Sequence, residues 1–280
     1  MSTAATQQKA VLKFENISEN IGARILNTKA ELLSGDFAVD LQELLERRGV
    51  LVLPQINFND EEQIAFTHLL GNFMPDLGGQ QVYNISLDKD KNVNRDYLKG
   101  SLFWHIDGTM NSEPIGAAVL SSKVLPTWGG NTEFCNTYAA YEALPEETKQ
   151  QIEGLRVVHS MWNTLMYHTP EPTRQELADY MTKGEVELPL VWTHKSGRKS
   201  LLLGNTAARV VGMEPMESAL LLHGLREHAT SKPFHYAHEW SQGDTVIWDN
   251  TGTMHRAMPY DPDCGRLLVR TKTAGIEPIK

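Results

Sequence analysis

The chain has 280 residues, 41% of them hydrophobic, which is enough apolar material to bury one large core. Its formal net charge of −9 argues against tight nonspecific nucleic-acid binding, which depends on lysine and arginine side chains that neutralise phosphates. Its 2 cysteines, Cys135 and Cys264, are too few for a disulfide framework and fit a reducing compartment. Without a signal-like apolar start or a membrane-length run, we expect a cytoplasmic protein with no membrane partner.

The N-terminal third predicts short strands and amphipathic helices around one core. The first ten residues are small and polar, and we expect them to be flexible. The first helix shows a one-sided apolar stripe closed by Gly49, and Asn59 supplies an N-cap for the second. We expect strands over 11–17, 22–26 and 49–54, and helices over 36–48 and 59–70. Residues 74–99 then predict one strand around Tyr83 flanked by loops.

The segment Phe103-Trp104-His105-Ile106-Asp107-Gly108 carries the first chemical signal. In a strand, His105 and Asp107 would point to the same face, so an imidazole and a carboxylate would converge as half of a metal site. An isolated His-x-Asp pair is common without any metal, so a third ligand is needed. His255, in Thr253-Met254-His255-Arg256, is the best candidate. Two histidines and one carboxylate form the facial triad of non-heme Fe(II) oxygenases.

The remaining elements predict a sheet-rich domain with one large insertion. We expect strands over 116–124, 131–135, 190–192, 200–203 and 244–249, and helices over 137–152 and 214–229. Residues 155–188 are irregular, with a predicted strand at 157–160 and a polar helix near 176–181, and we expect them to form a lid over the active-site mouth. Residues 11–280 should thus form a single catalytic domain. The other histidines match no metal pattern: His159 and His168 lack a second ligand, and the four between 223 and 238 fit no zinc spacing.

Several motifs together resemble one enzyme family. They are His105-x-Asp107, Gly129-Gly130-x-Thr132, Gly243-Asp244-x-x-x-Trp248-Asp249-Asn250, and His255 followed by Arg266. Over roughly residues 12 to 275, this pattern is similar to the Fe(II)/2-oxoglutarate-dependent dioxygenases related to taurine dioxygenase and the phenoxyacetate-herbicide dioxygenases (the TauD/TfdA family).

The resemblance implies a fold, a cofactor set and a reaction. The fold would be a mainly β double-stranded β-helix, a jelly-roll or cupin-like core with flanking helices. His105, Asp107 and His255 would bind iron, and Thr132 and Arg266 would hold the distal carboxylate of 2-oxoglutarate. With O2 as the third reactant, the enzyme would hydroxylate a small organic molecule and release succinate and CO2. Halogenases of this type lack the carboxylate ligand, so Asp107 favours hydroxylation.

The substrate is the least determined feature of the sequence. We expect a strand over 266–271, in which Arg270 lies on the same face as Arg266. The resemblance implies that a residue at the second position binds an anionic group. We therefore expect an organic acid, an aryl or alkyl carboxylate more than a sulfonate or sulfate ester. A neutral substrate, with Arg270 paired to a buried carboxylate, remains open. The further candidates for a pocket lining are Tyr83, Asn84, Trp104 and Trp162.

Two other classes of protein could use the same residues. A zinc hydrolase could activate water in the His-Asp-His site, but it gives no reason for an arginine-bearing strand after the second histidine. A cupin-like binding protein could keep the fold without turnover. The sequence leaves open whether the chain forms a homo-oligomer.

Overall fold

The computed structural model describes residues 11–88, 90–92 and 98–280, so the predicted flexible segment 1–10 lies outside the described residues. The strands are β1 Phe14–Asn16, β2 Ala23–Ile25, β3 Val50–Leu53, β4 Tyr83–Ile85, β5 Ile115–Val124, β6 Thr132–Asn136, β7 Arg156–Ser160, β8 Glu185–Pro189, β9 Val191–Thr193, β10 Lys199–Leu201, β11 Ala207–Val210, β12 His235–His238, β13 Thr245–Asp249, β14 Thr253–Ala257 and β15 Leu267–Ala274. The helices are α1 Lys29–Leu33, α2 Ala38–Arg48, α3 Asp60–Leu70, α5 Thr137–Glu142, α6 Glu146–Ile152, α7 Met161–His168, α8 Arg174–Met181 and α9 Pro215–Ala229. Short 3-10 turns are η1 Leu77–Gly79, η2 Lys99–Leu102 and η3 Lys232–Phe234.

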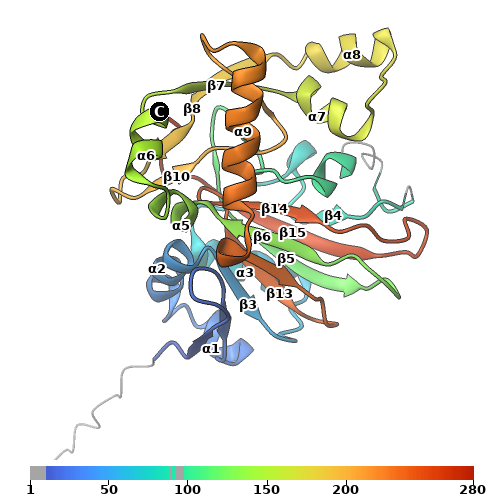
Figure 1. Cartoon of the computed structure of the whole chain (residues 1–280). Helices are drawn as coiled ribbons and strands as arrows, with labels where there is room; N and C mark the ends of the chain where they lie inside the picture. The colour runs from blue at the N-terminus through green and yellow to red at the C-terminus, as the bar shows by residue number, and fades with distance from the viewer. Residues whose placement is uncertain (1–10, 89, 93–97) are drawn as a thin grey trace, which may run out of the picture.

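The largest sheet has seven strands in the order β1-β2-β3-β13-β5-β15-β4. Its central strands alternate between two cores, because successive side chains of a strand point to opposite faces. In β5, Val119 packs with the buried apolar residues of α1, α2 and α3, whereas Leu120 faces the interior of the molecule. The three N-terminal helices therefore cover the outer face of this sheet (Figure 1).

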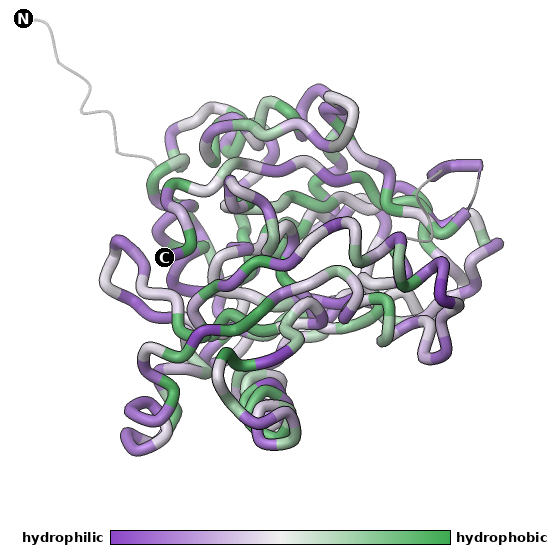
Figure 2. Tube along the Cα trace, turned by 90° about the horizontal axis from the view of Figure 1, so that it is seen from above, coloured by the Kyte–Doolittle hydropathy of each residue, from purple (hydrophilic) through white to green (hydrophobic). Residues whose placement is uncertain are grey.

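A three-stranded sheet, β12-β6-β14, lies opposite the inner face of the large sheet. Phe134 of β6 packs on Trp248 of β13, with ring centroids 5.6 Å apart, and joins the interior core of the large sheet. These two sheets, which face each other around an interior and are antiparallel except for the β2–β3 pair, form the predicted jelly-roll core. Figure 2 shows hydrophobic residues along strands crossing the middle of the molecule and mostly hydrophilic outer turns.

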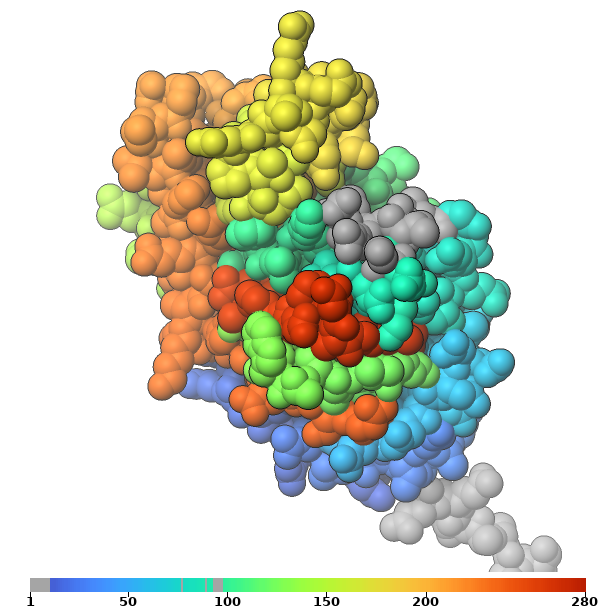
Figure 3. All heavy atoms as spheres, turned by 90° about the vertical axis from the view of Figure 1, so that its right-hand side faces the viewer, coloured from blue at the N-terminus to red at the C-terminus, as the bar shows by residue number. Residues whose placement is uncertain are grey.

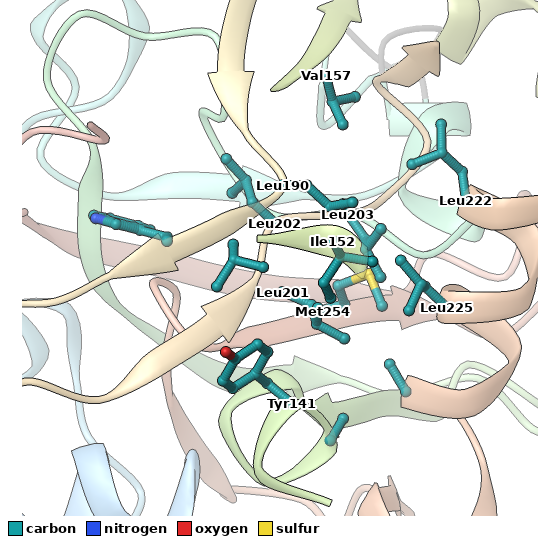
Figure 4. Packing of buried hydrophobic residues seen from close by; sticks show 14 of the residues in the cluster. Tyr141, Ile152, Val157, Leu190, Leu201, Leu202, Leu203, Leu222, Leu225 and Met254 are labelled. Carbon is teal, nitrogen blue, oxygen red and sulfur yellow. The ribbon is translucent and has the colours of Figure 1, made fainter. Parts of the chain in front are cut away.

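A third hydrophobic cluster lies behind the small sheet, under α9. Leu222 and Leu225 of this helix pack with residues of the β9–β10 hairpin and with Met254 of β14 (Figure 4). Met254 precedes His255 in β14. The Met254 side chain packs in this cluster, so the His255 side chain points to the opposite face of the strand. The packing behind β14 thus positions the strand that carries one predicted metal ligand.

Local signals located most of these elements correctly. Gly49 ends α2 with a positive φ of 72°, and Asn59 caps α3 through a reciprocal capping box with Glu62. Residues 155–188 are more regular than predicted, since they contain α7 and β8 besides the predicted strand, β7, and the predicted polar helix, α8. Helices α1 and α7 and strands β8, β11, β12 and β14 were missed. Within the described residues, every helix is too short or too polar to cross a membrane.

Candidate functional site

The two histidines meet through a backbone bridge. His105 and His255 exchange both backbone hydrogen bonds, at 3.0 and 2.9 Å, although His105 lies outside any regular strand. Their rings lie 4.1 Å apart between centroids. His105 Nδ1–H donates to the carbonyl of Phe103 over 2.8 Å, which leaves Nε2 with the free lone pair of a metal ligand. The bridge, which joins distant parts of the chain, therefore brings two imidazoles to one point.

Asp107 joins them from a turn, not from the predicted strand. The side-chain amide of Asn250 accepts from the N–H of Asp107 over 3.0 Å and donates to its carbonyl over 2.8 Å. Asn250 is buried at the end of β13 and also donates to the carbonyl of Ile115. These two hydrogen bonds hold the backbone of Asp107 so that its carboxylate turns back toward the imidazoles.

The three side chains converge closely enough to hold a divalent metal. One ligand atom from each of His105, Asp107 and His255 lies within 4.8 Å of the others. Burial by itself would raise the pKa of Asp107, but Arg270 and the two imidazoles hold that pKa well below its usual range. Burial, together with His105 and Arg270, lowers the pKa of His255 well below its usual value. A charged carboxylate and a neutral imidazole are the forms that metal ligands need, so the donor set fits such an ion.

Two hydrogen-bond donors mark one end of the adjoining cavity, which has a volume of about 230 Å³. Thr132 and Arg266 both line it and are almost completely buried. The Arg266 guanidinium donates to the carbonyl of Gly130 over 2.9 Å and stacks on Tyr260, while its Nε has no acceptor among the described residues. A Cβ on Gly130 would lie 3.0 Å from that Nε, so the glycine makes room for the guanidinium. This end suits a carboxylate.

A group of paired charges marks another part of the cavity. Arg270 donates to Asp107 Oδ2 over 2.7 Å and to the carboxylate of Asp76 over 3.0 and 3.1 Å. Lys272 donates to the same Asp76 over 2.8 Å. Tyr83 of β4 lies beside the guanidinium, 5.4 Å from its ring centroid, and lines the cavity as predicted. Arg266 and Arg270 thus reach one cavity, as their spacing predicted.

Three predicted pocket residues point elsewhere. Asn84 follows Tyr83 in β4 and faces solvent, because neighbouring strand residues alternate. Trp162 donates its indole N–H to Glu185 outside the cavity; Met161 and Thr164 of the same helix line it instead. The Trp104 ring stacks with Arg256, on the side of the segment away from the cavity. These three expectations are therefore wrong for the structure described.

Four residues of the site were not assigned a role from the sequence. Lys272 had a usable signal, because it lies two residues after Arg270 and so shares its face of β15. Asn250 stands in a recognised motif, but its bond to Asp107 spans the chain. Asp76, in a loop, and Trp240, which follows β12 and donates to Thr132 Oγ1 over 3.0 Å, carried no local signal.

Comparisons with known proteins agree with this geometry. The sequence matches the family described as Taurine catabolism dioxygenase TauD, TfdA family, over residues 13–272. It is 34% identical to the (S)-phenoxypropionate/alpha-ketoglutarate-dioxygenase of Sphingobium herbicidovorans, with 92% of this chain and 93% of that protein covered. It is also 34% identical to the alpha-ketoglutarate-dependent 2,4-dichlorophenoxyacetate dioxygenase of Cupriavidus pinatubonensis, with 87% of this chain and 90% of that protein covered.

A further similar protein is named as an alkylsulfatase, and solved structures share the fold. An alkylsulfatase of Acinetobacter baylyi is 32% identical, with 98% of this chain and 89% of that protein covered. The crystal structure of AAD-2 in complex with Mn(II) and N-oxalylglycine superposes with a TM-score of 0.83 at 31% identity, covering 97% of this chain and 100% of that chain. The predicted fold and reaction class are thereby confirmed.

Proposed function

The chain belongs to the TauD/TfdA family of Fe(II)- and 2-oxoglutarate-dependent dioxygenases, and from this premise we propose that it hydroxylates a small monoanionic organic acid. In this proposal His105, Asp107 and His255 hold the iron. Fe(II), when bound, supplies the oxidative chemistry, in which O2 and 2-oxoglutarate yield succinate, CO2 and an oxidised substrate. The other residues of the chain bind, orient and neutralise the reactants.

Thr132 and Arg266 are proposed to hold the distal carboxylate of 2-oxoglutarate. Both line the same cavity as the metal cluster, and the guanidinium of Arg266 is already oriented by Gly130 and Tyr260. A guanidinium pre-oriented in this way can donate to a carboxylate without losing further side-chain freedom. The Arg266 Nε, buried without an acceptor among the described residues, supports an incoming anion at this place.

The charge of the cavity is the single observation that carries the substrate proposal. Its described lining holds three cations, Arg266, Arg270 and Lys272, and two carboxylates, Asp76 and Asp107. These leave one positive charge. A metal dication and the 2-oxoglutarate dianion cancel each other, so one positive charge still remains for the primary substrate. A buried uncompensated charge is unfavourable, and a monoanionic substrate would remove it.

Arg270 is the proposed partner of that anion. It donates to Asp107, whose carboxylate would also ligate a bound metal, and sharing that carboxylate would free part of the guanidinium for substrate. The walls around it include Ile85, Ile115, Leu120 and Leu268, which would pack against an aryl or alkyl group. Relatives named for phenoxypropionate and 2,4-dichlorophenoxyacetate support a carboxylate over a sulfonate.

The segment 155–188 is proposed to cover the mouth of this cavity within a single catalytic domain of residues 11–280. Met161 and Thr164 of α7 already line the cavity. Figure 3 shows the α7–α8 segment in yellow, protruding at the upper edge of the molecule. A lobe with α8 packed on α7 and no buried side chain in α8 is suited to move as a unit.

The test is a mass-spectrometric screen of carboxylates, sulfonates, sulfate esters and neutral analogues, scored by succinate formed per substrate consumed. Coupled turnover should be found among monoanions, and Arg270→Ala should weaken their binding by roughly 2–5 kcal/mol, as removal of one partner of a buried charge pair does. Arg156→Ala is the matched control, because Arg156 pairs with Glu187 outside the cavity. Coupled turnover of neutral compounds only, with Arg270→Ala harmless, would exclude the anionic substrate.

A further inference from the structure

The hydroxyl of Thr132 is held by an indole from a distant part of the chain. Trp240 follows β12, and its Nε1–H donates to Oγ1 of Thr132 over 3.0 Å. Thr132 begins β6, is 4% exposed and lines the cavity beside Arg266. Its hydroxyl makes no other hydrogen bond within the part of the chain that the structure describes. One lone pair of the oxygen is therefore occupied, and the hydroxyl hydrogen is still available.

The chemistry of indole makes this contact directional. An indole N–H can only donate, whereas a hydroxyl can donate once and accept twice. The Trp240–Thr132 bond can therefore have only one polarity, in which Thr132 accepts. The hydroxyl hydrogen must then point away from Trp240, and the cavity lined by Thr132 is where it can find an acceptor.

We infer that Trp240 is a positioning residue for the cosubstrate: its N–H sets the Thr132 hydroxyl as a hydrogen-bond donor to the distal carboxylate of 2-oxoglutarate. This inference rests on the proposed function, in which Thr132 and Arg266 bind that carboxylate. It adds a residue that does not touch the cosubstrate and acts through Thr132.

The surroundings of Trp240 are built to hold the indole in place. The ring of His238 meets it edge-on, with centroids 4.5 Å apart and planes at 90°. His238 in turn lies between Tyr236, 2.9 Å from Nδ1, and Asp244, 3.2 Å from Nε2. Asp244 also accepts from the backbone N–H of Ser241 and of Gln55, both over 2.9 Å. The turn after Trp240 is thereby tied to the seven-stranded sheet.

The pairing of the small sheet places Trp240 beside Thr132. His238 is the register partner of Thr132 in the β12–β6 pair, so this pairing brings Trp240, two residues after the end of β12, close to the residue that it bonds. On the other side of the carboxylate site, Arg266 is oriented by Gly130. Each of the two residues proposed to donate to the carboxylate is thus held by a hydrogen bond of its own, Thr132 to Trp240 and Arg266 to Gly130.

The experiment measures binding of 2-oxoglutarate to the Mn(II)-loaded full chain by isothermal titration calorimetry. Trp240→Phe keeps an aromatic ring and removes the N–H, and it should raise the dissociation constant about 3- to 10-fold, the effect of one neutral hydrogen bond. Pyruvate, followed by competition, lacks the distal carboxylate, and its affinity should not change. Trp192→Phe, in a buried cluster behind the small sheet, is the matched control and should leave both constants unchanged.

A double-mutant cycle with Thr132→Val separates positioning from a general effect on the fold. In the Thr132→Val background, Trp240→Phe should have no further effect on 2-oxoglutarate binding, because its only route is through the hydroxyl. An equal loss in that background, an equal loss for pyruvate, or no loss in the single variant would each overturn the inference.

The cycle also distinguishes failure of the inference about Trp240 from failure of the proposed function. If Thr132→Val weakens 2-oxoglutarate binding but Trp240→Phe does not, the carboxylate site stands and Trp240 has no part in it. If Thr132→Val leaves the affinity unchanged, the proposed carboxylate site is itself wrong and the inference falls with it.

Discussion

At the scale of single residues, Asp107 has two partners that compete for one carboxylate. Arg270 donates to its Oδ2, and the imidazole of His105 lies 3.5 Å from its Oδ1. The guanidinium keeps the carboxylate ionised despite its burial. The site is thus ready for a cation before any cation binds, because no proton has to leave Asp107 first.

Replacing Asp107 should therefore abolish metal binding. Substitutions of groups that merely orient metal ligands weaken binding about 10- to 100-fold, so Asp107→Ala, which removes a proposed ligand, should cost more. His105→Ala and His255→Ala should behave alike. Titration with Mn(II), followed by electron paramagnetic resonance, measures this directly. Asp76→Asn is the control, since it also breaks an ion pair of Arg270 but removes no proposed ligand. Wild-type Mn(II) affinity in Asp107→Ala would show that this carboxylate is not a ligand.

Arg266 provides a second test at this scale. Arg266→Lys keeps the charge but loses the planar fork that serves Gly130 and an incoming carboxylate together. The affinity for 2-oxoglutarate should fall by roughly 1–3 kcal/mol, measured by calorimetry on the Mn(II)-loaded chain. Arg270→Lys should leave this affinity unchanged. The opposite pattern would assign the carboxylate to Arg270.

At the scale of elements, the turn after β13 supports the site. Asn250 binds both polar groups of the Asp107 peptide, and its own N–H donates to the carbonyl of Gly116 at the start of β5. The position of the carboxylate therefore depends on the β13–β5 pairing as well as on the local conformation of 105–108. The side chains of His105 and Asp107 therefore converge although residues 105–107 do not form the predicted strand.

Asn250→Ala should weaken Mn(II) binding about 10- to 100-fold, because the carboxylate loses the support that orients it. The variant keeps all three proposed ligands, so its effect is distinct from that of Asp107→Ala. Asn27→Ala is a matched control: Asn27 is also buried and also bonds to backbone groups, of Lys13 and Val11, but far from the site. Comparable loss of unfolding free energy in both variants, with Mn(II) affinity lowered only in Asn250→Ala, is expected. Unchanged Mn(II) affinity would exclude the support role.

At the scale of the whole molecule, one buried histidine should make stability depend on pH. His159 of β7 is fully buried, with Nδ1 2.9 Å from Thr206 Oγ1 and no partner for Nε2 among the described residues. Burial lowers the pKa of His159 from 6.5 to about 4. As the pH falls below 6.5, His159 becomes protonated in the unfolded chain, whereas in the folded chain it stays neutral down to about pH 4. The stability that neutral His159 contributes is therefore fully present above pH 6.5 and is lost as the pH falls from 6.5 to about 4.

The loss should reach about 3 kcal/mol by pH 4, the free energy of a shift of about 2.5 pKa units. Urea unfolding at pH 7 and pH 5 measures it. His159→Gln has no titrating group, so its stability should fall less between these two pH values than that of the wild type. An identical pH dependence in both proteins would mean that His159 does not cause it.

Sequence alone determined the reaction class and most of the elements, whereas tertiary structure decided how the cavity is lined. Helix ends such as Gly49 and Asn59 were predictable because caps depend on neighbouring residues, and the motif residues around His105 and His255 mark a chemistry that needs those side chains. Which residues face the cavity depends on strand register and on contacts across the chain. Asn84 faces outward for that reason, and Trp240 reaches Thr132 through the β12–β6 pairing. No local pattern encodes a contact between residues 108 positions apart, because it exists only once the two strands have paired.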